Sequence, residues 1–321
     1  MSACLLGQKV RFDGGHKRDA FLTDIFGRYV EWVAVCPEVE IGLGTPRDAL
    51  RLIDAAPSRR LRLVAPASGN DITDRMETYA ALRAARLEDE RLSGYVLKKD
   101  SPSCGMERVR VYGTGGVART GRGVFATALI GSMPDLPVEE EGRLNDAKLR
   151  ENFVERVFAF ARLRALFEAA RTNPAPASRR PSWHMGDLVA FHTAHKLTLM
   201  AHSPVAYREL GRFVATAKGR PAGMVERTYR SAFMKALARP ATPGRHANVL
   251  HHIAGFFKTN LDAAAKTELL TIVDDFRRGL VPRVVPLTLL RHYVARFDNA
   301  YLAGQVYLDP HPKELMLHNH V

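Results

Sequence analysis

The sequence predicts an α/β domain followed by an all-α domain. Three observations support this fold class: β-rich runs alternate with helical patterns up to about residue 145, only helical patterns continue after residue 183, and the charge differs between the two halves. A chain of 321 residues with 46% apolar side chains is long enough for two ordinary globular domains. We expect domains at residues 1–145 and 183–321, joined by a helix and a linker over 146–182.

The first domain is expected to hold a mainly parallel sheet with helices on both faces. Strand-like runs occur at 29–35, 61–64, 95–97 and 109–112, and helical patterns at 72–91 and 123–130. Strands that alternate with helices are typical of such sheets, which bind ligands at the carboxyl ends of their strands. The glycine-rich run 113–123 predicts a hairpin-type turn, with a phosphate cradle as the alternative. It lacks the ending of a P-loop, so no nucleotide triphosphate is expected.

The second half predicts helices only. A helical apolar repeat covers 151–170, and residues 172–183 are rich in Pro, Ser and Ala and predict a linker. Further helical patterns follow at 185–201, 205–218, 224–238, 248–261, 264–278 and 286–299, with prolines between several of them.

The positive charge is concentrated in the second half. Residues 1–150 carry 23 Lys and Arg against 21 Asp and Glu, whereas residues 151–321 carry 24 against 13. Such asymmetry favours a polyanionic partner for the second half, with a merely solvated basic surface as the alternative. No run of 18 uncharged apolar residues and no signal-peptide pattern occurs, so we expect a cytoplasmic protein without a membrane span.

The three cysteines are Cys4, Cys36 and Cys104. Their odd number argues against a disulfide framework. Each follows a strand-like run closely or at a short distance and lies among Gly, Pro and Ser, so the three could meet at one sheet edge. Three unrelated free cysteines are the alternative.

Three thiolates in one place would suit two kinds of metal centre. A zinc site would need a fourth ligand, and His16 is nearby in sequence. An iron–sulfur cluster normally has four cysteine ligands, so three would leave one iron open as a Lewis acid. The cysteine count therefore suggests a cluster that binds a substrate atom.

The cysteine motifs resemble those of the thiouracil desulfidase (TudS) family over about residues 1–145. They are Ser2–Gly7, Cys36–Leu43 with Pro46-Arg47, and Ser101–Gly105. The second half resembles the YbgA-like helical domain often fused to that family, with marks at 191–196, 199–203, 248–252, 255–258, 286–293 and 310–312. The two-domain arrangement resembles the RudS type, which removes sulfur from 4-thiouridine in tRNA.

The resemblance implies a [4Fe–4S] cluster on Cys4, Cys36 and Cys104, whose open iron takes the thiocarbonyl sulfur while water attacks the carbon. Glu38 is the expected general base, and Ser101 and Ser103 are expected to relay protons or orient the base. A scaffold role for Glu38 and a turn-capping role for Ser101 stay open.

The expected partner is tRNA carrying 4-thiouridine, bound through phosphates. The candidate contacts are Arg47, Lys196, Lys258, Arg291 and His292, with an ion pair to an acid as the alternative for Arg47. His192, His195 and His202 share a predicted helix, but satisfied core histidines are more common than ligands. Two rival functions remain: a desulfidase of free thiouracil-type bases with a helical oligomerisation domain, and a non-enzymatic regulator with a cluster as its sensor.

Overall fold

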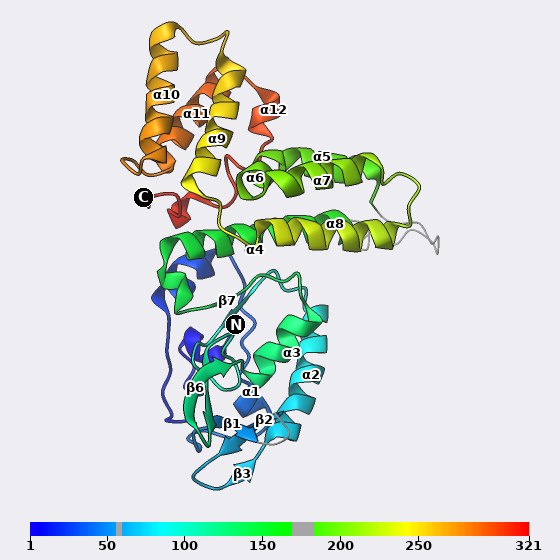
Figure 1. The fold of residues 1–321 in the computed structure, drawn as a ribbon, viewed down its shortest axis with the longest axis vertical. Helices are drawn as coiled ribbons and strands as arrows, with labels where there is room; N and C mark the ends of the chain where they lie inside the picture. The colour runs from blue at the N-terminus through cyan, green and yellow to red at the C-terminus, as the bar shows by residue number, and fades with distance from the viewer. Residues whose placement is uncertain (56–59, 169–182, 321) are drawn as a thin grey trace. The chain divides into compact units, whose positions relative to one another are not determined.

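The computed structural model describes residues 1–55, 60–168 and 183–320, which form two compact units (Figure 1). Met1–Asp146 is a mixed unit of helices and strands, here called the α/β unit, and Ala147–Val321 is the helical unit. This confirms the fold class expected from the sequence. None of the described helices is long and apolar enough to cross a membrane.

The larger sheet of the α/β unit has the strand order β3-β2-β1-β5-β6. Its strands are β1 (Arg51–Ala55), β2 (Arg60–Ala65), β3 (Asn70–Asp71), β5 (Val109–Gly113) and β6 (Gly116–Gly121). Only β1 and β5 run parallel, with Leu52 opposite Val111, and the other three pairs are antiparallel.

The expectation of a mainly parallel sheet is therefore wrong for the larger sheet. The reason is the length of the connections, since a parallel crossover needs a dozen or more residues. Four residues separate β1 from β2, four separate β2 from β3, and two separate β5 from β6. The glycine-rich run 113–123 thus contains a β-hairpin, the more ordinary of its two interpretations.

A second, smaller sheet carries the parallel pairing. In it β4 (Tyr95–Leu97) pairs in parallel with β7 (Val138–Glu140). Ser2 extends this arrangement, because its N–H donates to the Val96 carbonyl at 3.0 Å and it forms a parallel bridge with Val35. The run 29–35 predicted as a strand pairs only at Val35. Its end is bonded to Met1 and Ala3 through the backbone of Val33 and Val35.

The two longer helices of this unit, α2 (Thr73–Asp89) and α3 (Val124–Ser132), pack against each other, so no sheet lies between them. This corrects the expectation of helices on both faces. α2 buries Met76, Ala80, Ala84 and Leu87 on one stripe and contacts β2. The remaining helical elements are α1 (Pro37–Glu40), the 3₁₀ helices Ala3–Leu6, Phe26–Arg28 and Arg143–Asn145, and the π-helical turn Phe21–Ile25.

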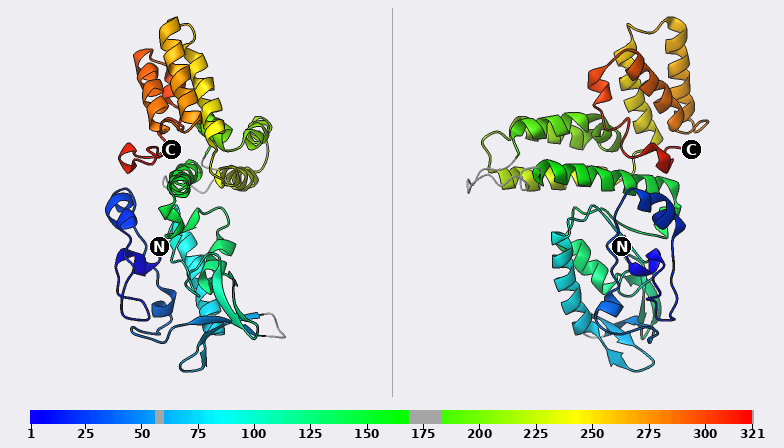
Figure 2. Two further views of the ribbon diagram at one scale, coloured as in Figure 1. Left: turned by 60° about the vertical axis from the view of Figure 1, so that its left-hand side comes forward. Right: turned by 180° about the vertical axis from the view of Figure 1, so that it is seen from behind.

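The helical unit has two apolar cores. Its helices are α4 (Ala147–Glu168), α5 (Met185–Ala194), α6 (Lys196–His202), α7 (Pro204–Ala215), α8 (Ala222–Leu237), α9 (Pro243–Ala254), α10 (Ala263–Arg277), α11 (Val284–Arg296) and α12 (Ala300–Ala303), with 3₁₀ turns at Gly255–Phe257 and Lys313–Leu315. One core lies among α4, α5, α7 and α8, and α4 and α8 run side by side in every view (Figure 2). The other lies among α9, α10 and α11.

The predicted helix 185–201 is two helices, because the backbone turns at His195. The connecting helix expected after residue 146 is α4, which belongs to the helical unit. Most of the linker expected at 172–183 lies outside the described residues.

Histidines are part of the interior of the helical unit. His202 donates from Nδ1 to the Arg239 carbonyl at 2.8 Å and from Nε2 to Glu155 at 3.1 Å. Arg283 forms an ion pair with Glu151 and donates to His246, whose Nδ1 lies 3.0 Å from the Tyr307 hydroxyl. We call the following set the interior histidine network: Glu151, Glu155, His202, His246, Arg283, Tyr307, His311, His318 and His320.

We predict that mild acid destabilises the helical unit. Burial lowers the pKa of His195 to about 4 and of His246 to about 3, and it lowers the pKa values of His311 and His318 as well. The unfolded chain then binds more protons than the folded one, so the free energy of unfolding falls as the pH drops below about 6.5. At pH 5 the loss should be about 2 kcal/mol for each of His195 and His246. Burial opposes ionisation of His202 too, but Glu155 raises its pKa, which offsets part of the effect.

Trp183 can report this change, because it lies in the core beside Phe167, and Trp32 is the other tryptophan of the chain. In a Trp32→Phe variant, the urea midpoint from Trp183 fluorescence should be lower at pH 5 than at pH 8. Replacing the exposed His251 with Gln should not alter that difference. Equal midpoints at the two pH values would contradict the prediction.

Candidate functional site

Cys4 and Cys36 each lie in a tight turn directly after a strand-like segment. Cys4 belongs to the 3₁₀ helix Ala3–Leu6, which ends at Gly7 with a φ of 91°, a conformation that favours glycine. Cys36 is the N-cap of α1, with Pro37 at the first helical position. The Cys36 thiol lies 3.5 Å from Glu38 Oε2 and 3.8 Å from the Val10 carbonyl.

Cys104 lies in a turn organised by Ser101. The Ser101 hydroxyl accepts the N–H groups of Ser103 at 3.2 Å and of Cys104 at 3.0 Å, and the Ser101 carbonyl accepts the N–H of Gly105 at 2.8 Å. Gly123 lies against this turn, where a Cβ atom would overlap the Ser103 carbonyl and stand 2.8 Å from the Cys104 nitrogen. The Cys104 turn therefore needs glycine at position 123.

The three cysteines line one pocket of the α/β unit, which has a volume of about 460 Å³. This size is in the range of small-molecule sites. Glu38, Arg47 and Ser101 line the same pocket. Its wall is basic, since seven Lys and Arg face three acids: Arg11, Lys17, Arg47, Arg51, Lys98, Lys99 and Arg110 against Glu38, Asp48 and Asp100.

All three cysteines are free thiols. Burial raises the pKa of Cys4, and burial with the nearby Glu38 carboxylate raises the pKa of Cys36 to about 12. Burial, then Glu38 and the other two cysteines, raise the pKa of Cys104, which shows that the three sulfurs lie within electrostatic range of one another.

The side chain of Glu38 is held between a thiol and a guanidinium. Only 9% of the residue is exposed, and Oε2 lies 3.9 Å from Arg47 Nη2. Arg47 in turn donates from Nη1 to the carbonyls of Val10 and Gly44 at 2.9 and 3.0 Å. Arg47 thus adopts the alternative role of an ion pair with a neighbouring acid, and it fixes the carboxylate beside Cys36.

Ser101 and Ser103 differ in their relation to the pocket. Ser101 lines it, and its oxygen already accepts two N–H groups, so its hydroxyl hydrogen is available for donation. Ser103 is fully buried and does not line the pocket. Among the described residues its hydroxyl has no hydrogen-bond partner.

The pocket fits a cluster better than a single metal ion. Within residues 1–55, 60–168 and 183–320, no three His, Cys, Asp or Glu side chains are placed to hold one metal ion. His16 is exposed and does not line the pocket, so the zinc alternative gains no support. In a cubane cluster each cysteine binds a different iron, so its ligands stand farther apart than those of one ion. Three free thiols around one basic pocket suit that arrangement.

The other predicted phosphate contacts lie on three different parts of the helical unit, with Arg291 and His292 both on α11. Lys196, on α6, lies 5.9 Å from the centre of the Tyr207 ring, and Lys258 and His292 are exposed. Arg291 donates to the Leu308 carbonyl and lies 3.0 Å from Asp309, so it is engaged within the fold. His195 and His202, also considered as ligands, are buried core residues.

Two residues that build the site escaped the sequence analysis. The Ser2 hydroxyl accepts the Lys98 N–H at 3.1 Å, and its hydrogen bond to Cys104 partly opposes the rise in the pKa of that thiol. Gly123 belongs to the glycine-rich run and shows its role only through a contact between segments distant in sequence. The position of Ser2 two residues before a cysteine was the only available signal.

Two family models match the chain, one in each unit. The model described as "2-thiouracil desulfurase" matches residues 1–141, and the one described as "Protein of unknown function (DUF1722)" matches residues 196–312.

Individual proteins match in the same pattern. The chain is 31% identical over 175 residues to the uncharacterized protein YbgA of Escherichia coli strain K12, covering 54% of this chain and 96% of that protein. It is 30% identical over 149 residues to the uncharacterized protein YbbK of Bacillus subtilis strain 168, covering 46% and 97%. A solved structure of the [4Fe–4S]-dependent thiouracil desulfidase TudS is 34% identical, with a TM-score of 0.36, and covers 45% of this chain and 91% of that one.

We predict that Gly123→Ala removes metal binding by displacing the Cys104 turn. Gly115→Ala is the matched control, because a Cβ there meets nothing within 4 Å. After anaerobic incubation with iron and sulfide, Gly123→Ala should retain less than about a tenth of the iron of the parent, as expected when one of three ligands is misplaced. The control should retain all of it. Equal iron contents in the two variants would show that the close approach at Gly123 does not position a ligand.

Proposed function

The chain is an enzyme that joins a member of the 2-thiouracil desulfurase family to a member of the DUF1722 family, and on this premise we propose that it removes sulfur from 4-thiouridine in tRNA. The products are uridine and hydrosulfide. The reaction is a hydrolysis, in which water supplies the new carbonyl oxygen and no electrons are exchanged.

The observation that carries this proposal is the shared pocket of Cys4, Cys36 and Cys104. These residues would hold a [4Fe–4S] cluster by three thiolates, and its remaining iron would supply a Lewis acid for the thiocarbonyl sulfur. Basic side chains such as Arg11, Lys17 and Lys98 would favour the thiolate forms of the ligands.

Glu38 accepts a proton from the attacking water. Its carboxylate oxygen Oε2 lies 3.5 Å from the Cys36 thiol and 3.9 Å from the Arg47 guanidinium. A buried carboxylate fixed by a guanidinium is restricted in orientation, which is what a general base requires.

Ser101 donates a hydrogen bond to the substrate. The two N–H groups that its oxygen accepts direct its remaining hydrogen away from the turn, and the residue faces the pocket. A donor in this position would stabilise negative charge on the pyrimidine ring or protonate the leaving sulfur. We assign no step to Ser103, because it is not part of the pocket lining.

The charge of the helical unit favours a phosphate-bearing substrate over a free base. A neutral pyrimidine needs no extended cationic surface, yet the helical unit carries most of the net positive charge of the chain. The name of the matching family is the one observation in favour of the free-base reaction.

Single Cys→Ser changes at positions 4, 36 and 104 should each abolish both the cluster absorbance and turnover. Glu38→Gln should keep the absorbance and lower kcat by about 10²- to 10⁴-fold, the usual contribution of a positioned proton-transfer group. Ser101→Ala removes the acceptor of the Ser103 and Cys104 N–H groups, so it should lower the absorbance together with kcat. Glu31→Gln is a control, because Glu31 is exposed and does not line the pocket. A variant of Glu38 that loses iron together with activity would assign Glu38 to the scaffold instead.

The substrate is tested with the full chain after anaerobic reconstitution with iron and sulfide. Loss of the near-ultraviolet absorbance of 4-thiouridine in bulk tRNA measures the proposed reaction, and free 4-thiouracil serves as the competing substrate. We expect a kcat/KM at least tenfold higher for tRNA. Turnover of the free base alone would establish the rival function.

A further inference from the structure

The positive charge of the helical unit is concentrated on one helical hairpin. Residues 204–239 hold eight Lys and Arg against two Asp and Glu, whereas residues 240–321 hold nine against seven. We call residues 204–239, which comprise α7, the turn after it and α8, the basic hairpin. It accounts for much of the charge excess found in the sequence of the second half.

The inner side of the basic hairpin is used for folding. Ser203 caps α7 by accepting the Ala206 N–H at 3.1 Å, and Leu210 and Val214 are buried on one side of that helix. On α8 the buried side carries Val225, Tyr229 and Phe233. All five apolar side chains belong to one core of the helical unit. The outer side is therefore the part of the hairpin left for a partner.

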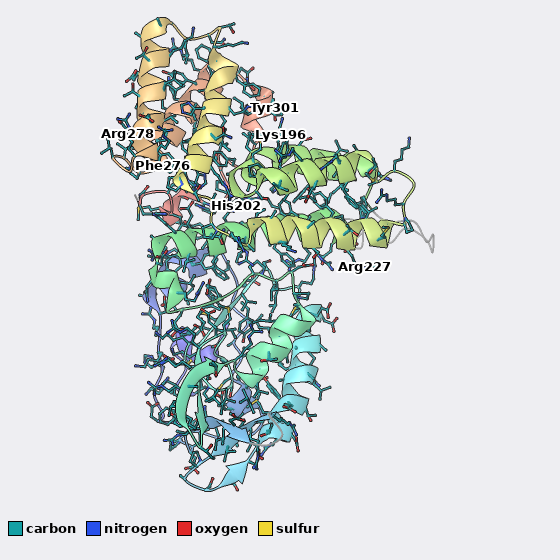
Figure 3. All side chains as sticks on the ribbon, viewed as in Figure 1. Lys196, His202, Arg227, Phe276, Arg278 and Tyr301 are labelled. Carbon is teal, nitrogen blue, oxygen red and sulfur yellow. The ribbon has the colours of Figure 1, made fainter. Side chains whose placement is uncertain are left out.

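The outer side carries seven exposed cations and one exposed acid, Glu209. The cations are Arg208, Arg212, Lys218, Arg220, Arg227, Lys235 and Arg239. Arg227 extends outward from α8, as Figure 3 shows. Apart from Arg220, which bonds to Thr216 and stacks on Phe213, none has an ionic or hydrogen-bonding side-chain partner within the described part of the chain. The other acid, Glu226, is paired with Arg230.

This pattern does not stabilise the free protein. Arg208 and Arg212 are four residues apart on α7. Like charges at this spacing lie about 6 Å apart along a helix and destabilise it by a few tenths of a kcal/mol. A bound polyanion would relieve that repulsion.

We propose that the basic hairpin is the surface of the helical unit that binds the phosphate backbone of RNA. This inference rests on the proposed function, and it names the surface that would hold the tRNA. It differs from the sequence expectation, which placed the contacts at Lys196, Lys258, Arg291 and His292.

Two features favour RNA over other polyanions. Five of the seven cations are arginines, whose planar guanidinium binds phosphate through two hydrogen bonds. Exposed apolar side chains on the hairpin are few, chiefly Val205 and Met224, because its aromatic and most of its aliphatic groups face inward. A membrane-binding helix needs a free apolar face, and a protein interface usually has an aromatic or aliphatic centre.

The test compares two full-length variants of equal net charge. The hairpin variant is R208Q/R212Q/R227Q/K235Q, and the control is R277Q/R278Q/R296Q/K313Q, whose four cations are also exposed but lie outside the hairpin. The four hairpin residues have no partners to lose, so the hairpin variant should keep the thermal midpoint of the parent. In the control, Arg277 and Arg278 lose exposed ion pairs to Asp274, which are worth at most about 1 kcal/mol, so its midpoint should fall only slightly.

We expect the hairpin variant to bind tRNA about 10- to 100-fold more weakly at ~150 mM salt, with the slope of log affinity against log salt reduced by about 3. The control should bind as the parent does. With 4-thiouridine tRNA, the hairpin variant should show a raised KM, whereas turnover of free 4-thiouracil should be unchanged.

The outcomes separate this inference from the proposed function. If the parent does not desulfurate tRNA yet binds it through the hairpin, the proposed function fails and the inference stands. If the parent desulfurates tRNA and the hairpin variant matches the control in affinity and slope, the inference is overturned alone. Loss of binding to phosphatidylserine vesicles or polyglutamate, without loss of tRNA binding, would reassign the hairpin to a membrane or an acidic protein.

Discussion

The candidate site depends on the hydrogen bonds of one residue, Ser2. Its N–H and hydroxyl bond to Val96 and Lys98, and its backbone bridges to Val35. The three segments aligned in this way lead directly into the turns of Cys4, Cys36 and Cys104. Because neighbouring strand ends meet at one edge of a sheet, a few backbone bonds bring together sulfurs separated by up to 100 residues of sequence. The basic wall and the Glu38–Arg47 pair are arranged around that edge.

How much of the fold and of the candidate site can be predicted from the sequence depends on whether the sequence pattern behind each feature is local. The division into an α/β and a helical part follows from hydrophobic periodicity. Gly, Pro and Ser residues close in sequence indicate the turns that hold the three cysteines. The direction of strand pairing has no such local signal. The sequence predicts no strand at β1 or β3, so it does not reveal the short connections that force antiparallel pairing. The sequence reasoning expected parallel pairing in the large sheet, yet the cysteines lie beside the small one, where β4 and β7 are parallel.

A count of Lys and Arg over the second half combines residues that have different structural roles. The excess of Lys and Arg in the second half includes Arg283, which is buried against Glu151, and Arg291, which holds the Leu308 carbonyl. These residues act within the fold, whereas Arg208, Arg212 and Arg227 have no such partners. Only the burial and the bonding partners of an arginine distinguish one that belongs to a core from one that is free to bind a ligand.

Synthesis from the N-terminus brings the members of the interior histidine network together at different times. Glu151 and Glu155 belong to α4, whereas Arg283, Tyr307, His311 and His318 follow more than a hundred residues later. The α/β unit ends at Asp146 and is complete in sequence before α4 is made, so it is able to fold first. The helical unit cannot bury its two glutamates with their partners until the segment around His318 has left the ribosome. A chain that stalls earlier would leave these carboxylates unpaired and the apolar core residues exposed to solvent, the state that chaperones and proteases recognise.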